Sequence, residues 1–261
     1  MKILIITSCT GEKAVDHPGS LRLVDFQQGP AHVAVREAEL ADVLMPARDL
    51  YTGQQHVRLM SGVRAFEEAH PTNGSGPAIE LLILSAGYGL VAADRDLAPY
   101  ETTFNGMKAK ELRHWADTLH VPEDIRAALA KPYDLCLLLL GDSYLKACAL
   151  SDDVRLGGPT IAFCGARAAA ALPKLHGLLA VPLTNADAKR FRCALIGVKG
   201  ELAGKLLKVW GERPEEAAGL SPAGLLDSLD GGHGAATAPA KRRAARPNPK
   251  VDFVVHIPQS W

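Results

Sequence analysis

Residues 81–91 read LLILSAGYGLV, an apolar run that ends in a serine, two glycines and a tyrosine. Together with Ile79 and Glu80 it predicts a strand over residues 79–85 that is buried on both faces. Gly87 and Gly89 let the backbone turn sharply and approach a ligand closely. Because ligands of open α/β sheets collect beyond the carboxyl ends of strands, the segment predicts one wall of a functional site. The alternative is a tight strand exit with Tyr88 packed against the protein.

The same apolar character recurs in three other segments and predicts strands over residues 2–8, 133–140 and 159–164. Alanine, valine and leucine at helical spacing predict helices over residues 30–44, 51–69 and 108–119, with a short helix near Ile125. Strands that are apolar on both faces and alternate with helices indicate an α/β fold with a mainly parallel sheet flanked by helices.

Shifts in composition divide the chain into four parts. Residues 1–183 form the expected α/β core domain with the pocket, and residues 184–214 form a basic helical segment. Residues 215–250 are rich in alanine, glycine and proline and contain KRRAAR, which indicates a flexible linker. Residues 251–261, VDFVVHIPQSW, regain strand character and are expected to dock on the core.

Charge and cysteine usage limit the class of protein. Lysine plus arginine equals aspartate plus glutamate at 29 each, so attraction to nucleic acid needs a local basic patch. The opening MKILIITSC is too short to span a membrane, and the five cysteines have no CxxC spacing. We therefore expect a cytoplasmic protein with reduced thiols and no membrane partner. The nine histidines include no HxxxH pair, so we expect no metal and no cofactor.

Polar side chains follow three of the predicted strands. These residues are Ser8, Cys9, Thr10 and Lys13 after the first, Ser85, Gly87, Tyr88 and Gly89 after the second, and Gly141, Asp142, Ser143 and Tyr144 after the third. An amine at a strand mouth binds a phosphate or, once desolvated, attacks a sugar carbon, which makes Lys13 a catalytic candidate. Cys9 is either a thiolate stabilised by Lys13 or a small buried thiol.

Carboxylates are the second requirement for chemistry at a sugar carbon, because they stabilise a cationic transition state or activate water. Asp49, Glu101 and Asp142 qualify by position, although Asp49 also fits a helix cap and Glu101 a solvated carboxylate. The GxG of residues 87–89 lacks the third glycine of a dinucleotide fingerprint, and CTGEK lacks the first glycine of a P-loop. Both standard nucleotide motifs are therefore excluded.

Three blocks together resemble the YaaA superfamily: SCTGEK at residues 8–13, PARDLYTGQQHVRLMSGV at residues 46–63 and LLILSAGYGLVAADRDLAPYETTF at residues 81–104. Thr10 replaces the serine of that family's C-S-x-x-K signature, and Lys13 stays in register. The resemblance covers roughly residues 1–150 and implies nucleic-acid or nucleobase handling. The site residues that it implies are Ser8, Cys9, Lys13, Asp49, Tyr51, Thr52, Gly53, Ser85, Tyr88, Gly89, Pro99, Tyr100 and Glu101.

The resemblance also implies a DNA-binding helix-hairpin-helix, and ALIGVKGELAGKLL at residues 194–207 approaches that pattern. In such an element a glycine turn lets backbone amides meet a phosphate. The candidate nucleic-acid-binding residues are Lys189, Arg190, Arg192, Gly197, Lys199, Gly200 and Lys205. The glycines are three apart where the usual hairpin has them two apart, so an ordinary helix start with solvated lysines is the alternative.

These features favour an enzyme that cleaves the N-glycosidic bond of a modified base in DNA, that is, a DNA glycosylase. Tyr88 would stack on the flipped base, Asp142 or Glu101 would stabilise the sugar cation or activate water, and Lys13 would hold a phosphate or attack the sugar. The alternatives are a non-enzymatic DNA-binding protein of a stress response and a hydrolase or transferase of free nucleosides or nucleotides. The oligomeric state is left open.

Overall fold

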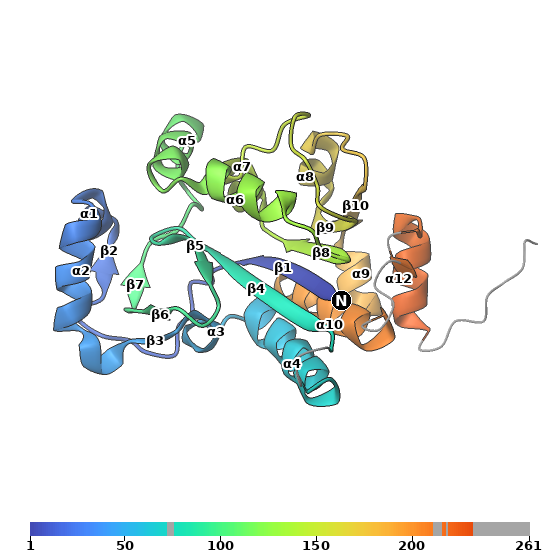
Figure 1. The fold of residues 1–261 in the computed structure, drawn as a ribbon, viewed down its shortest axis with the longest axis horizontal. Coiled ribbons are helices and arrows are strands. Elements are labelled where there is room, and N and C mark those ends of the chain that lie inside the picture. The colour runs from blue at the N-terminus through green and yellow to red at the C-terminus, as the bar shows by residue number, and fades with distance from the viewer. Residues whose placement is uncertain (72–75, 211–215, 218, 232–261) are drawn as a thin grey trace, which may run out of the picture.

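A six-stranded sheet forms the centre of the molecule in a computed structural model that describes residues 1–71, 76–210, 216–217 and 219–231 (Figure 1). Its strands stand in the order β10-β9-β8-β1-β4-β5. They are β1 (Lys2–Ser8), β4 (Ala78–Ser85), β5 (Gly89–Ala92), β8 (Leu135–Leu139), β9 (Thr160–Gly165) and β10 (Leu178–Leu183). All neighbours are parallel except β5, which runs antiparallel to β4. The predicted mainly parallel α/β fold is confirmed.

The central strands are apolar because both faces of the sheet are covered. Every residue of β8 is buried, and in β1 burial runs from Ile3 to Ser8. Ile5 stands between Leu81 and Leu137 in the register of the three central strands. Such continuous burial explains why these segments lack the apolar and polar alternation of a strand with one face in water.

Helices lie on both faces of the sheet. On one face are α4 (Gln54–Ala69) and α10 (Val198–Trp210); on the other are α5 (Ala109–Thr118), α6 (Val121–Ala130), α7 (Asp142–Ala147) and α8 (Ala166–Ala171) (Figure 1). Helices α4 and α10 meet so closely that a Cβ atom on Gly62 would be 2.3 Å from the Cα atom of Gly204. Helix α10 is therefore part of the core, and it follows α9 (Asn185–Arg190) and η2 (Leu195–Gly197) along the chain.

A small lobe stands beside the carboxyl end of β4, at the left of Figure 1. It consists of β2 (Leu21–Arg22), α1 (Leu23–Gln27), α2 (Pro30–Glu39), η1 (Ala41–Val43), β3 (Met45–Pro46), α3 (Ala47–Leu50), β6 (Asp96–Leu97) and β7 (Tyr100–Glu101). Two short pairs, β2 with β7 and β3 with β6, join its two halves. The predicted helix over residues 51–69 begins only at Gln54, because Tyr51 and Gly53 have extended backbone.

The carboxy-terminal part differs from the sequence-based prediction in two ways. Strand β10 was not predicted, and it contains Pro182. Residues Pro222–Asp230 form helix α12 with Leu225 fully buried, so the prediction of a flexible linker over residues 215–250 is wrong for this stretch. The strand predicted over residues 251–261 lies outside the described residues.

The strand order creates a switch point between β1 and β8. The first crossover carries the chain from β1 to β4 on one side, whereas the later strands β8, β9 and β10 are added on the other side. The segments that follow β1 and β8 therefore diverge and leave a crevice at the carboxyl edge of the sheet. Doubly wound folds bind their ligands in this place.

Candidate functional site

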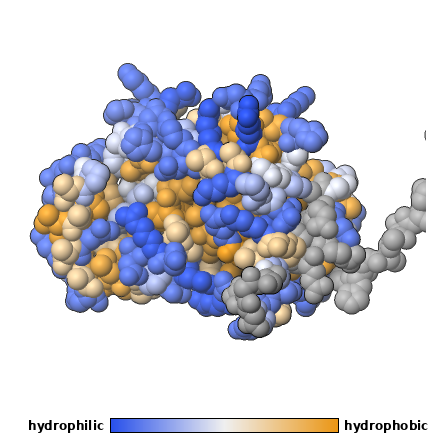
Figure 2. All heavy atoms as spheres, in the orientation of Figure 1, coloured by the Kyte–Doolittle hydropathy of each residue, from blue (hydrophilic) through white to orange (hydrophobic). Residues whose placement is uncertain are grey.

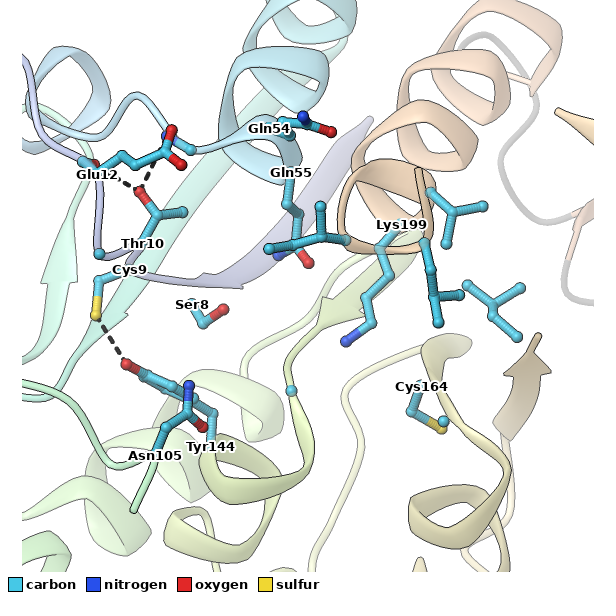
Figure 3. A pocket seen from close by; sticks show the side chains of 18 residues that line it. Ser8, Cys9, Thr10, Glu12, Gln54, Gln55, Asn105, Tyr144, Cys164 and Lys199 are labelled. Carbon is cyan, nitrogen blue, oxygen red and sulfur yellow. Dashed lines mark hydrogen bonds between the residues drawn. The ribbon is translucent and has the colours of Figure 1, made fainter. Parts of the chain in front are cut away.

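A pocket of about 840 Å³ occupies the crevice at the switch point (Figure 3). Its walls come from the segments that follow four parallel strands and from the amino ends of α4 and α10. The lining residues are Ser8, Cys9, Thr10, Gly11, Glu12, Gly53, Gln54, Gln55, Asn105, Gly141, Tyr144, Cys164, Gly165, Leu183, Leu195, Ile196, Val198 and Lys199. The volume falls within the range of small-molecule sites.

The loop after β1 is fixed by the segment that leads into α4. The amide of Gly53 donates to Thr10 Oγ1 at 3.2 Å, and the Thr10 hydroxyl donates to the carbonyl of Glu12 at 2.9 Å. The amide of Thr52 donates to the same carbonyl at 3.1 Å. Position 53 accepts only glycine, because a Cβ atom there would be 2.6 Å from that of Thr10. The predicted contribution of Thr52 is thus made by its backbone.

Gln55 closes the bottom of the pocket. Its side-chain amide donates to Thr7 Oγ1 in β1 at 3.1 Å and to the carbonyl of Leu139 in β8 at 2.8 Å. One buried side chain therefore ties together the two strands between which the crevice opens. Gln55 was not predicted as a site residue, although it lies two positions after the predicted Gly53.

Cys9 and Tyr144 form one end of the pocket. The Cys9 sulfur lies 3.1 Å from the Tyr144 hydroxyl (Figure 3). Burial raises the pKa of Tyr144 above its ordinary value, so this hydroxyl is protonated at neutral pH. A separate segment, residues 103–105, lies next to this end of the pocket. The Thr103 hydroxyl is 3.5 Å from that of Tyr144, and Asn105 lines the pocket.

Lys13 and Glu101 pair with each other behind this end of the pocket. The Lys13 side chain is only 5% exposed, its ammonium lies 3.8 Å from Glu101 Oε1, and it stands 4.6 Å from the centre of the Tyr100 ring. Burial lowers the pKa of Lys13, while Glu101 and Cys9 raise it. Lys13 does not line the pocket, and this placement does not support its predicted role as the attacking amine.

Three of the predicted binding residues form a buried network instead of a pocket wall. The Tyr51 and Tyr100 hydroxyls are 2.8 Å apart, and Ser85 Oγ donates to Tyr100 at 2.7 Å. The same serine oxygen accepts the amides of Gly87 and Tyr88, at 3.1 and 2.9 Å. Burial raises the pKa of both tyrosines well above the ordinary range, so the network is uncharged at neutral pH.

Tyr88 is not placed to stack on a base in the pocket. Its ring packs edge-on against Phe26 and Tyr100, with ring centres 5.0 and 5.4 Å apart, and Arg95 lies over it. Position 87 accepts only glycine, because a Cβ atom there would be 2.5 Å from the Phe26 ring. The alternative of a tight strand exit with a packed tyrosine is the correct one. Residues 81–91 therefore form no wall of this pocket.

Gly89 and Asp49 are also structural. Gly89 has φ +71°, which favours glycine at the turn into β5. Asp49 lies within α3 and pairs with Arg64 at 3.0 Å on the surface. Neither lines the pocket.

Lys199 and Cys164 form the other end of the pocket. Lys199 reaches in from α10, with Cys164 opposite (Figure 3), and its ammonium donates to the carbonyl of Leu140 at 2.6 Å. Burial lowers the pKa of Lys199, while Cys164 and Asp142 raise it. Asp142 borders this end, because a Cβ atom on Gly165 would be 3.3 Å from Asp142 Oδ1. Glu12, Gln54 and Asn105 also belong to the polar lining, and none of them was predicted from the sequence.

The predicted nucleic-acid-binding residues of the carboxy-terminal segment differ in their surroundings: Lys189 and Arg192 are exposed, whereas Arg190 is held in ion pairs. Arg190 pairs with Asp227 at 2.9 Å and with Asp230 at 2.8 Å. Gly200 lies against the backbone of α4, and Gly197 lies next to the Arg58 side chain, which a Cβ atom at residue 197 would meet at 3.0 Å. The helix-hairpin-helix element is not confirmed.

A second pocket of about 370 Å³ lies between α5, α7 and α8, on the opposite side of Asp142. We call it the α5–α8 groove. Its lining is mostly apolar, and it carries Ser143, Asp142 and three exposed cations: Arg113, Lys146 and Arg167. No ion pair is formed by these cations within the described residues. Figure 2 shows hydrophilic side chains around a hydrophobic area at the top of the molecule, where Figure 1 places these helices.

Two further features bear on ligands and membranes. Among the described residues, no three histidine, cysteine, aspartate or glutamate side chains gather as metal ligands would. Within the same ranges, each helix is too short or too polar to cross a membrane.

The fold is that of a doubly wound α/β protein with a pocket at its switch point. Residues 38–156 match the model of a family of unknown function, DUF6884. No curated protein matches the chain. The matched range includes Gly53, Gln55, Asn105 and Tyr144 of the pocket, whereas β1 and α10 lie outside it.

Proposed function

We propose that the protein binds a nucleobase in the switch-point pocket and cleaves the N-glycosidic bond that joins the base to its sugar. The observation that carries the proposal is a pocket large enough for a nucleoside that has side-chain amides and the carboxylate of Glu12 on its wall, with the carboxylate of Asp142 next to Gly165 at its margin. A base needs hydrogen-bonding partners in the ring plane, and a sugar cation needs a carboxylate.

Gln54 and Asn105 are the proposed readers of the base. Both side chains are exposed at the pocket, and the structure gives neither a side-chain hydrogen bond within the described residues. A carboxamide offers a donor and an acceptor side by side, as the edge of a base requires. The aromatic ring of Tyr144 and the apolar side chains of Leu195 and Ile196 offer contact area to the base.

Asp142 is the proposed catalytic carboxylate. It borders the pocket beside Lys199, whose ammonium is held by the carbonyl of Leu140. A carboxylate in this place would stabilise the oxocarbenium-like sugar or activate the attacking water. Glu12 is the other carboxylate at the pocket. Base release by variants that lack the charge of Asp142 or of Glu12 decides which of the two is catalytic. Glu101, the other predicted carboxylate, is engaged with Lys13.

DNA is the proposed form of the substrate. The α5–α8 groove places Arg113, Lys146 and Arg167 next to Asp142, where a strand that continues from the bound base would pass. Phosphates contribute most of the affinity of nucleic-acid complexes through such cations. Free nucleosides are the second candidate, because Arg190 in the predicted basic segment is neutralised by Asp227 and Asp230.

Base release tests the proposal. The full chain is incubated with single-stranded and duplex DNA carrying normal or modified bases, and with nucleosides, and released bases are identified by mass spectrometry. We expect Asp142→Asn to lower release by about 100-fold or more, whereas the exposed Asp117→Asn in α5 serves as the matched control and leaves release unchanged. Salt-sensitive DNA binding without release of a base from any substrate would overturn the proposed enzymatic activity and favour a non-enzymatic DNA-binding protein.

Two further expectations stay predictions. All five cysteines are free thiols, the state that a reducing cytoplasm maintains, and this supports a cytoplasmic location. The relation to the YaaA superfamily rests on the sequence blocks that resemble it.

A further inference from the structure

The thiol of Cys9 lies where the pocket meets the end of β1. The backbone remains paired past Ser8, because the Cys9 amide donates to the carbonyl of Leu84 at 3.0 Å. The residue is only 7% exposed, yet it lines the pocket. The surrounding backbone therefore holds the sulfur in a fixed position against whatever the pocket contains.

Tyr144 supplies this thiol with a fixed hydrogen-bonding partner. The sulfur and the phenol oxygen are 3.1 Å apart. The Tyr144 ring is held edge-on against Phe104, with ring centres 5.1 Å apart. Because burial raises the pKa of Tyr144, its hydroxyl can donate to the sulfur at neutral pH.

Lys13 adds a buried amine on the same loop. Its interaction with Cys9 is electrostatic, and Glu101 lies 3.8 Å from its ammonium. Cys9, Lys13, Glu101 and Tyr144 thus gather a thiol, an amine, a carboxylate and a phenol from three segments of the chain. Reactive cysteines occur in partly accessible settings of this kind, next to a cation and a proton donor.

The other four thiols lack this setting. Cys136 and Cys148 are fully buried in the core, away from both pockets. Cys164 reaches the pocket, but burial raises its pKa to about 11. Cys193 is more exposed than Cys9 and lies outside both pockets, and burial raises its pKa as well. Cys193 is therefore a natural internal control, since exposure alone would make it the faster thiol.

We propose that Cys9 is a nucleophile that adds covalently to an unsaturated ring carbon of the heterocycle held in the pocket. The sulfur–carbon bond forms as the ring double bond opens. Its electron pair moves to the neighbouring ring atom, which takes up the proton released by the thiol, directly or through Tyr144. The addition needs no oxidant, and its reversal returns the ring and the thiol unchanged. The identity of the heterocycle as a base rests on the proposed function; the reactivity of Cys9 does not.

Alkylation by iodoacetamide tests the reactivity without any substrate. The full chain is treated for increasing times at mildly alkaline pH, and each cysteine is followed by peptide mass spectrometry. We expect Cys9 to be labelled at least about tenfold faster than the more exposed Cys193. Tyr144→Phe should slow labelling of Cys9 severalfold and leave the rate at Cys193 unchanged. Labelling of Cys193 first, or of Cys9 only after denaturation, would overturn the proposal.

Cys9→Ser in the base-release assay separates this inference from the proposed function. Serine keeps the size of the side chain and removes most of its nucleophilicity, and circular dichroism verifies that the variant is folded. Fast labelling of Cys9 without base release from any substrate contradicts the proposed function alone. Equal base release by Cys9→Ser and by the unmodified chain contradicts only the proposed nucleophilic role of Cys9.

Discussion

Gly200 of α10 lies directly against the backbone of Gln55 in α4: a Cβ atom on residue 200 would be 2.1 Å from the Gln55 carbonyl oxygen. The same Gln55 donates through its side chain to Thr7 and Leu139, on the two strands that border the pocket. Gln55 therefore takes part both in the contact between α4 and α10 and in the hydrogen bonds that join β1 to β8. The carboxy-terminal helix thus positions the pocket as well as lining it.

Gly200→Ala should destabilise the protein. Alanine improves helix propensity by about 1 kcal/mol, but the added methyl group meets backbone atoms that cannot move aside, and such overpacking costs about 1–3 kcal/mol or more. The clash outweighs the propensity, and we expect a lower urea midpoint with an unchanged slope. Gly11→Ala is the control, since no atom lies within 4 Å of its Cβ position. A urea midpoint of Gly200→Ala at or above that of the unmodified chain would show that α4 and α10 can move apart without loss of stability.

Gln55→Leu should destabilise the protein by about 1–3 kcal/mol, because it removes two buried hydrogen bonds while keeping a similar volume. The neighbouring Gln54→Leu is the matched control. Its side chain is exposed and should change the free energy of unfolding by less than about 0.5 kcal/mol. Urea unfolding of both variants makes the comparison. Equal midpoints would mean that the bridge between β1 and β8 contributes nothing to stability.

Alkaline titration should leave every tyrosine protonated near pH 10. Burial raises the pKa of all five, to about 12 for Tyr133 and by clear margins for Tyr51, Tyr88, Tyr100 and Tyr144. Because the folded-state values are higher, these groups contribute stability that is complete below pH 10 and is lost as the pH rises through them. Tyrosinate absorbance at pH 10 should be near zero in the native protein and half-developed in urea. Half-ionisation of the native protein at that pH would contradict the burial.

Reversal of the three groove cations should weaken binding to single-stranded DNA. We expect the triple variant Arg113→Glu, Lys146→Glu and Arg167→Glu to reduce the slope of log affinity against log salt by about 2, as expected for three lost phosphate contacts. Fluorescence anisotropy at several salt concentrations measures the slope.

The matched control for the groove is the triple variant Lys189→Glu, Arg192→Glu and Lys205→Glu, which changes charge equally in the carboxy-terminal segment. We expect its salt slope to equal that of the unmodified chain. The reverse pattern would move the DNA surface from the α5–α8 groove to the carboxy-terminal segment.

The sheet could be predicted from the sequence because burial on both faces leaves a local signal. Each of the segments 2–8, 79–85, 133–140 and 159–164 shows it as a continuous apolar run, and all four are strands in the structure. Strand β10 has only the short run LLAVPL, interrupted by Pro182, and its place at the edge of the sheet makes that proline acceptable.

The candidate site was predicted only in part, because it depends on the order of the strands. Four of the predicted binding residues, Ser8, Cys9, Thr10 and Gly53, line the pocket, since β1 borders the switch point. Tyr88 follows β4, which lies on the other side of β1, and its side chain packs into the small lobe. Lys199 was predicted as a nucleic-acid-binding residue, but its place in the pocket was not, because it comes from a helix about sixty positions beyond β8.

The central position of β1 also constrains how the chain acquires its structure. β1 requires neighbours on both sides, and Leu135 of β8 follows Ser8 by 127 positions. At ribosomal speeds of about 5–20 residues per second, synthesis of that interval takes on the order of ten seconds. During this time the apolar segment KILIITS has an unpaired edge that is prone to association with other chains. Pairing with β4, which is complete at Ser85, covers only the opposite edge of β1, so the edge that faces β8 stays unpaired until Leu135–Leu139 has been synthesised.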